Sequence, residues 1–252
     1  MPSSSVNPNP QPHPKLTRWT PQRITLAVLL GLLALWAGSR AWFDILYIAR
    51  KDEEASQVWL VLPIFAWLMW TRRHAIASTR PRFSWIGPAL IALGTGASLY
   101  GFLNLQQALW HGGAVLALVG AFATTAGRPL VWKMLPALVV LAFWVPVPGM
   151  IRQSIAIPMQ TASASASEFV FTLIGLPVAR TGNVLIYNGQ EVAVAEACNG
   201  MRMVFALLLV AYAFAFANPL RPWVRAMVLV LSPVAAVFCN VLRLVPTVFL
   251  YG

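Results

Sequence analysis

The sequence predicts an all-α, polytopic membrane protein: a bundle of about seven transmembrane helices with a small outward-facing β-hairpin. Of its 252 residues, 59% are hydrophobic and only 10% are charged, whereas a soluble domain carries about 25% charged residues. Such a chain lacks the polar surface that water requires, so lipid is the expected solvent. The apolar segments follow one another almost end to end, which favours one membrane domain.

Seven segments approach the length of about 20 mostly apolar residues that a membrane-spanning helix needs. They are residues 24–43, 57–71, 84–103, 106–125, 130–148, 197–217 and 224–250. The second is short and would recruit flanking residues. Glycine and proline occur inside several of them, which transmembrane helices tolerate.

The first 22 residues form a separate region. They are rich in Pro, Ser and Asn, a composition typical of disorder, and we expect a disordered cytoplasmic tail at 1–22 before a membrane domain at 23–252. No cleavable signal peptide is evident, so the first apolar run would act as an uncleaved signal anchor.

The charges support this topology. With the N-terminus in the cytoplasm and strict alternation, the inner side carries 11 basic residues and no acid, and the outer side carries 7 basic residues and all 7 acids. This asymmetry obeys the positive-inside rule. It also explains the net charge of +11 without a nucleic-acid partner.

Two outer segments are more than loops. Residues 149–176 are rich in small residues and weakly amphipathic, and we expect a helix that lies along the outer interface or dips into it. Next, NVLIY and EVAVA flank Asn188-Gly189, which predicts a β-hairpin. The hairpin leads directly into Glu196, Ala197 and Cys198, and would hold a reactive group in place.

Cys198 opens the sixth span, followed by Asn199. Unpaired N–H groups and the dipole of a helix favour an anion in its first turn, which would promote the reactive thiolate. Arg202, four residues on, lies on the same helix face. A small cysteine that fills a gap remains the alternative.

Arg243 lies inside the seventh span, in the segment FCNVLRLVP. Twenty residues at about 1.5 Å each carry that helix about 30 Å from its cytoplasmic start, to the expected outer level of Cys198. An arginine within a membrane helix marks a functional site by default, although it could snorkel to the headgroups. Asn240, one turn earlier, can hydrogen-bond across helices.

The other candidates are weaker. Cys239 could form a redox pair with Cys198, but a packing role is favoured because it lies deeper. His111, about one turn into the fourth span, is either a packing residue or an acid–base partner. Two cysteines make neither a disulfide framework nor a metal site, and no phosphate-binding or metalloprotease motif is present, so neither a cofactor nor a metal is expected.

These residues resemble the exosortase/archaeosortase family of membrane transpeptidases. The segment AEACNGMR, followed about 40 residues later by NVLRL, carries the resemblance. Three further stretches support it: DEEASQVWLVLPIFAWLMWTRR, FWVPVPGMIRQSIAIPMQ and GLPVARTGNVLIYNGQEVAVA. The similarity covers roughly residues 25–250.

The resemblance implies a cysteine protease-transpeptidase of the bacterial inner membrane, with its active site at the outer, periplasmic face. Cys198 would be the nucleophile and Arg243 the second catalytic residue. Its substrates would be exported proteins whose C-terminal tail has a short motif such as Pro-Glu-Pro, a membrane helix and a basic cluster. The acyl group would pass to a lipid or a surface glycan.

The family's third catalytic residue is a histidine, or an arginine in archaeal members, on a further downstream helix. The sequence given stops at Gly252, before such a helix, so either the chain is a fragment or this member lacks the residue. Two other functions remain open: a membrane thiol-disulfide oxidoreductase that uses Cys198 and Cys239, and a non-catalytic scaffold or degenerate family member.

Overall fold

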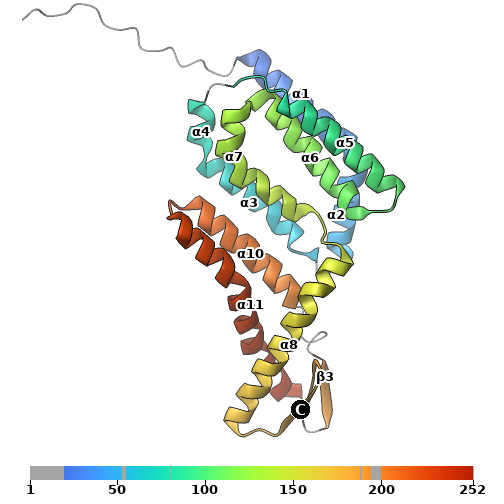
Figure 1. Cartoon of the computed structure of the whole chain (residues 1–252), viewed down its shortest axis with the longest axis vertical. Coiled ribbons are helices and arrows are strands. Elements are labelled where there is room, and N and C mark those ends of the chain that lie inside the picture. Colours follow the sequence, from blue (N-terminus) through green and yellow to red (C-terminus); the bar gives the residue numbers. More distant parts are fainter. Residues whose placement is uncertain (1–19, 53–54, 80, 188, 194–199, 252) are drawn as a thin grey trace, which may run out of the picture.

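The computed structural model describes residues 20–52, 55–79, 81–187, 189–193 and 200–251. Within them the chain is a helical bundle with a small lobe at one end (Figure 1). The helices of the first half are α1 (Pro21–Ala37), α2 (Ser39–Lys51), α3 (Val58–Thr71), α4 (Arg73–Ser78), α5 (Ile86–Leu103), α6 (Gln107–Ala126) and α7 (Arg128–Val140). A 3₁₀ helix, η2 (Leu141–Trp144), follows, and then α8 (Gly149–Ile174), α10 (Gly200–Ala217) and α11 (Pro222–Tyr251).

The number of membrane spans differs from the prediction. Among the described residues, three helices are long and apolar enough to cross a membrane: α5, α6 and α11. The number rises to five if each of two bent helix pairs counts as one span. The apolar helix α3 and the apolar part of α10 (Arg202–Ala217) are shorter than a full span. The predicted all-α membrane fold is therefore confirmed, whereas the seven separate spans are not.

The expected first span is broken at Gly38, where α1 and α2 meet at an angle of 63°. Apolar composition continues through the break, but α2 is amphipathic and turns its apolar side inward, burying Trp42 and Ile45. The indole Nε1 of Trp42 donates a hydrogen bond across the bend to the carbonyl oxygen of Leu35, at 3.0 Å. A chain that changes direction here presents α2 to α6 instead of continuing α1.

Helices α5 and α6 form a close antiparallel hairpin because glycines line their contact. Gly87, Gly94 and Gly101 recur every seven residues and are the buried residues of α5. A Cβ atom at Gly94 would lie 2.5 Å from the backbone nitrogen of Ala117 and 2.7 Å from the carbonyl oxygen of Gly113. Membrane helices gain their attraction from such close approach, since lipid offers no hydrophobic driving force between them.

The next expected span, 130–148, ends early. The α7–η2 segment runs to Trp144, and α8 leaves it at an angle of 93°. Between them lies VPVP (145–148), whose prolines cannot continue a helix hydrogen-bond ladder. The helix expected within 149–176 is confirmed as α8, which is continuous over 26 residues, whereas its location at the outer interface stays a prediction.

The chain then forms a three-stranded antiparallel sheet from β1 (Val178–Thr181), β2 (Val184–Tyr187) and β3 (Gln190–Ala193). The predicted hairpin is the β2–β3 pair: Tyr187 faces Gln190, and Gly189 adopts a φ of +80° between them. Strand β1, which the sequence did not predict, joins through a second two-residue turn at Gly182, with a φ of +62°. Both turns place glycine where a side chain would be strained.

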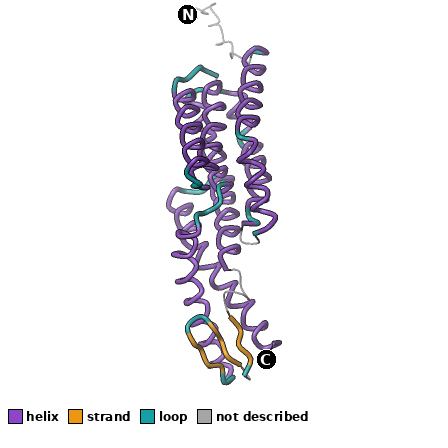
Figure 2. Tube along the Cα trace, turned by 90° about the vertical axis from the view of Figure 1, so that its right-hand side faces the viewer, coloured by secondary structure: helices purple, strands orange, loops and turns teal. Residues whose placement is uncertain are grey.

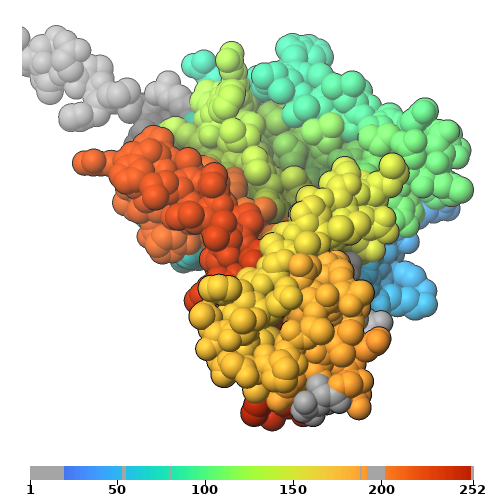
Figure 3. All heavy atoms as spheres, turned by 60° about the horizontal axis from the view of Figure 1, so that its bottom comes forward, coloured from blue at the N-terminus to red at the C-terminus, as the bar shows by residue number. Residues whose placement is uncertain are grey.

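The described residues form three clusters of buried apolar side chains. The largest lies in the bundle, around Trp42, Ile45, Leu68 and Trp144. A second lies along α7, around Leu130 and Met134. The third joins α8, the sheet and the last part of α11, through Ala164, Phe171, Leu185, Leu244 and Val248. We call the unit formed around this third cluster the lobe. Figure 2 shows the sheet at the end of the molecule opposite the start of α1, and Figure 3 shows α8, the sheet and the end of α11 close together there.

Candidate functional site

Three of the expected site residues, Glu196, Cys198 and Asn199, lie outside the described residues. The structure describes the strand before these residues and the helix after them. Strand β3 ends at Ala193, and α10 begins at Gly200. The segment that carries Cys198 therefore connects the sheet to a helix N-terminus, as the sequence predicted.

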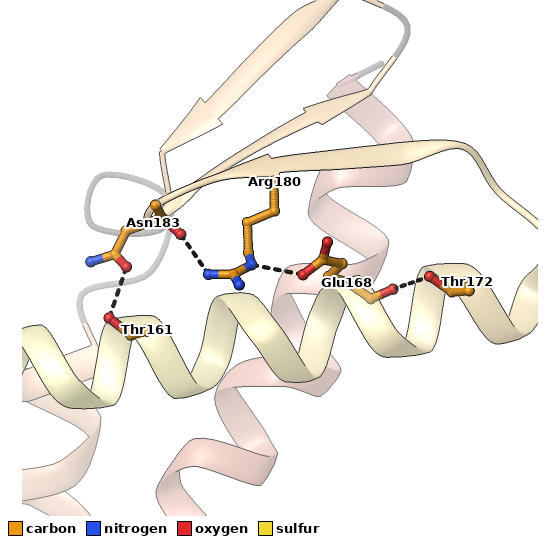
Figure 4. Close-up of polar contacts among 6 residues, drawn as sticks. Thr161, Glu168, Thr172, Arg180 and Asn183 are labelled. Atoms are coloured by element: carbon orange, nitrogen blue, oxygen red, sulfur yellow. Dashed lines mark hydrogen bonds and ion pairs between the residues drawn. The ribbon is translucent and has the colours of Figure 1, made fainter.

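The sheet is held on α8 by polar contacts as well as by its apolar core (Figure 4). Arg180 on β1 donates from Nε to Glu168 Oε2 at 2.7 Å, and its Nη1 donates to the carbonyl oxygen of Gly182 at 3.0 Å. At the same turn, Thr161 Oγ1 donates to Asn183 Oδ1 at 3.0 Å. These contacts join α8 to the end of β1 and to the turn that follows it, so the sheet that precedes the Cys198 segment is attached to α8.

Asn240 connects α11 to α8. Its side chain is buried, and Nδ2 donates to Ser163 Oγ at 3.1 Å. One turn later on α11, Leu244 enters the core of the lobe. Arg243 is exposed between these two buried anchors, at the position where α11 passes from the bundle into the lobe. The expected cross-helix role of Asn240 is confirmed.

Arg202 is exposed near the start of α10, and α10 packs along α11. The two arginines thus lie on neighbouring helices, one just after the Cys198 segment and the other where α11 enters the lobe. Cys239 is also exposed on α11. The described residues therefore do not bury Cys239, and its expected packing role stays a prediction.

His111 is fully buried and belongs to a different part of the molecule. Its Nε2 lies 2.9 Å from Asp44 Oδ2 on α2, and its ring stacks on Trp110. This contact favours the packing interpretation over the acid–base one. Sequence reasoning had counted Asp44 only as an outer charge, since no spacing rule connects it to His111.

The opposite end of the bundle is held by Arg72, whose Nη2 donates to the carbonyl oxygen of Phe216 at 2.7 Å. Burial is the main cause that lowers the pKa of the Arg72 guanidinium, and nearby Arg225 acts in the same direction. This contact fixes the end of α3 to the end of α10. It therefore aligns α10, the helix that Cys198 precedes.

A cavity of about 590 Å³ opens at the end of the bundle from which α8 leaves toward the lobe. Its wall comes from the end of α2, the start of α3, the α5–α6 turn, the VPVP segment and Phe205 of α10. An ion pair crosses part of this wall, with Arg152 Nη1 lying 2.9 Å from Asp52 Oδ2. The volume of the cavity is within the range of about 300–1,000 Å³ that is typical of ligand sites.

Comparison with known proteins identifies the family. No curated protein and no solved structure matches the chain. The family of transmembrane exosortases matches residues 42–252. This range covers most of the chain and includes the ACNGMR segment, which runs into α10, the NVLR segment of α11, and the residues that line the cavity. The chain therefore belongs to the transmembrane exosortase family.

Proposed function

We propose that this protein is a membrane cysteine protease-transpeptidase that cleaves the C-terminal sorting signal of exported proteins. Family membership over residues 42–252 carries the proposal. The position of Cys198 supports it, because this residue lies between the sheet and the first turn of α10, where a helix N-terminus favours a thiolate.

In this reaction the Cys198 thiolate attacks the carbonyl carbon of the scissile peptide bond. The C–N bond breaks, a thioester forms on Cys198, and the tail leaves as an amine that takes up a proton from a general acid, for which the family resemblance implies a histidine. An acceptor hydroxyl or amine then attacks the thioester, gives its proton to the same group, which now acts as a general base, and releases the Cys198 thiolate. The acceptor would be a lipid or a surface glycan.

Arg243 would stabilise the oxyanion of the tetrahedral intermediate or the thiolate itself. Its position supports this role, since buried Asn240 and Leu244 fix α11 on either side of it. Arg202 would add positive charge beside Cys198, and Glu196, Asn199 and Asn240 would position the segment. His111 would act in helix packing, because it is hydrogen-bonded to Asp44.

The reaction would occur at the outer face of the bacterial inner membrane, with the N-terminus in the cytoplasm. The charge asymmetry counted for the predicted seven-span topology supports this orientation. A substrate tail with a membrane helix and a basic inner end would insert in the same direction. Its scissile bond would then lie on the side of the membrane that carries the lobe.

The test is processing of a tail-bearing reporter protein in cells that express the full chain. Cys198→Ala should abolish processing while the protein remains inserted in the membrane. Cys239→Ala is the matched control, because it removes the other cysteine, and it should process normally. Arg243→Ala should also abolish processing, whereas Arg221→Ala, on the turn before α11, should not.

Normal processing by Cys198→Ala would contradict the nucleophile assignment. Loss of processing in Cys239→Ala, together with a Cys198–Cys239 disulfide in the resting protein, would favour a thiol-disulfide oxidoreductase instead. Mass spectrometry of the alkylated protein detects that disulfide directly.

A further inference from the structure

We infer that the cavity of about 590 Å³ beside α10 binds an extended segment of the substrate peptide, with Gln57 as a specific acceptor for one of its backbone N–H groups. The inference rests on the proposed function and adds a substrate-binding site to it. The cavity is formed by described residues outside the Cys198 segment.

Gln57 is the observation that points to a ligand. Its side chain is 8% exposed and lines the cavity. Its Oε1 is buried without a hydrogen-bond partner among the described residues. A buried acceptor left unpaired costs about 1–3 kcal/mol. The unpaired Gln57 Oε1 is explained if a donor group of the bound peptide reaches it.

The rest of the lining fits a peptide backbone. Gln106 and Gln107 add side-chain amides, which can donate to and accept from peptide groups. Pro146, Pro148 and Phe205 supply apolar surface for side chains. An acyl chain would leave the Gln57 oxygen unpaired, whereas an extended peptide offers an N–H at every residue other than proline.

The location of the cavity also favours the substrate. Phe205 lies on α10, seven residues after Cys198 in the sequence. Arg152 belongs to α8, the helix on which the sheet is held. Its ion pair with Asp52 joins the start of α8 to the end of α2. A peptide in the cavity would therefore contact α10, which follows the Cys198 segment, and α8, on which the preceding sheet is held.

Binding can be tested without catalysis by using the full chain in a Cys198→Ala background. A photo-crosslinking amino acid replaces Met150, which lines the cavity and is 84% exposed. The matched control carries it at the adjacent Ile151, which is 54% exposed and is not part of the cavity lining. The probe is a reporter protein with a C-terminal motif, membrane helix and basic cluster, co-expressed in the same membrane.

We expect crosslinks to the reporter from position 150 and at least tenfold fewer from position 151. Crosslinks from position 150 to phospholipid alone would overturn the inference. Mapping the crosslinked reporter residue should place it outside the membrane helix of the tail. A crosslink confined to that membrane helix would also overturn it, because the cavity would then bind a helix and not an extended segment.

Gln57→Leu provides the second test. Because Oε1 has no partner among the described residues, replacing it with an apolar group should leave thermal stability unchanged or raised. It should lower the yield of the 150-position crosslink about tenfold, the effect of losing one well-formed hydrogen bond. Gln153→Leu, an exposed glutamine on α8 that does not line the cavity, should leave the yield unchanged.

An unchanged crosslink yield in a stable Gln57→Leu protein would overturn the role of Gln57. These results are independent of the nucleophile assignment. If Cys198→Ala processed the reporter normally, the proposed mechanism would fail, and the crosslinks would still report whether the cavity holds the peptide.

Discussion

His111 on α6 forms a hydrogen bond with Asp44 on α2, in which Nε2 lies 2.9 Å from Oδ2. The two residues are 67 positions apart in the chain. The histidine is fully buried, while the Asp44 side chain is 29% exposed. The pair fixes α2 against α6 immediately after the bend at Gly38. It is a polar contact between helices, and loss of one partner leaves the other unsatisfied.

Asp44→Ala should therefore destabilise the protein by about 1–3 kcal/mol, the cost of an orphaned buried polar group. His111→Ala should cost at least as much, because it also leaves a cavity. The thermal midpoint in detergent measures both, and the double variant should be less destabilised than the sum of the single variants. Additive effects would show that the two side chains are not coupled. Glu191→Gln, at an exposed position of β3, is the control.

Gly94→Ala should weaken the α5–α6 hairpin, because the new Cβ would lie under 3 Å from backbone atoms of Gly113 and Ala117. Overpacking of this kind costs about 1–3 kcal/mol. Gly96→Ala on the same helix is the matched control, since a Cβ there meets nothing within 4 Å. The yield of monodisperse protein and its thermal midpoint should fall for Gly94→Ala alone. Equal behaviour of the two variants would contradict the close helix contact.

The lobe should depend more on its apolar core than on its ion pair. Leu185→Ala removes a fully buried side chain and should cost about 2–5 kcal/mol. Arg180→Ala breaks a contact between two partly exposed groups and should cost under about 1 kcal/mol. Hydrogen exchange of the β1 and β2 amides should be faster in Leu185→Ala. A larger loss of stability in Arg180→Ala than in Leu185→Ala would show that the ion pair contributes more to the lobe than the apolar core does.

The proposed orientation predicts opposite labelling of the two ends of the molecule. In a protein with Cys198→Ala and Cys239→Ala, Gln190→Cys on the sheet should react with an impermeant maleimide in intact spheroplasts. Pro219→Cys, in the turn between α10 and α11, should react only after the membrane is opened. Labelling of Pro219→Cys without permeabilisation would reverse the orientation.

Hydropathy predicted the position of most helices closely. The expected spans 84–103 and 106–125 correspond to Ile86–Leu103 and Gln107–Ala126. The Asn188-Gly189 pair predicted the hairpin, because a two-residue turn of this composition is typical of two antiparallel strands. The bend at Gly38 was missed because apolar composition reports burial in lipid and carries no information on the direction of the backbone.

The sequence relates two polar residues to each other only where they share a local motif. Arg243 and Asn240 lie one turn apart on one helix, so a spacing rule connects them. The pairs Asp44–His111 and Asp52–Arg152 join helices that are distant in sequence. Gln57 gave no signal at all, since an unpaired acceptor is a property of its surroundings and not of its residue type.

The composition of the lobe core has a consequence for biogenesis. Ala164, Phe171 and Leu185 are buried against Leu244 and Val248, which are synthesised much later. During translation the sheet therefore lacks its apolar cover until α11 has entered the membrane. Long-range contacts form only when both partners are present. A nascent chain that contains Cys198 but not yet α11 would therefore lack the residues that complete the core of the lobe. Completion of the lobe around the Cys198 segment would wait until α11 is synthesised.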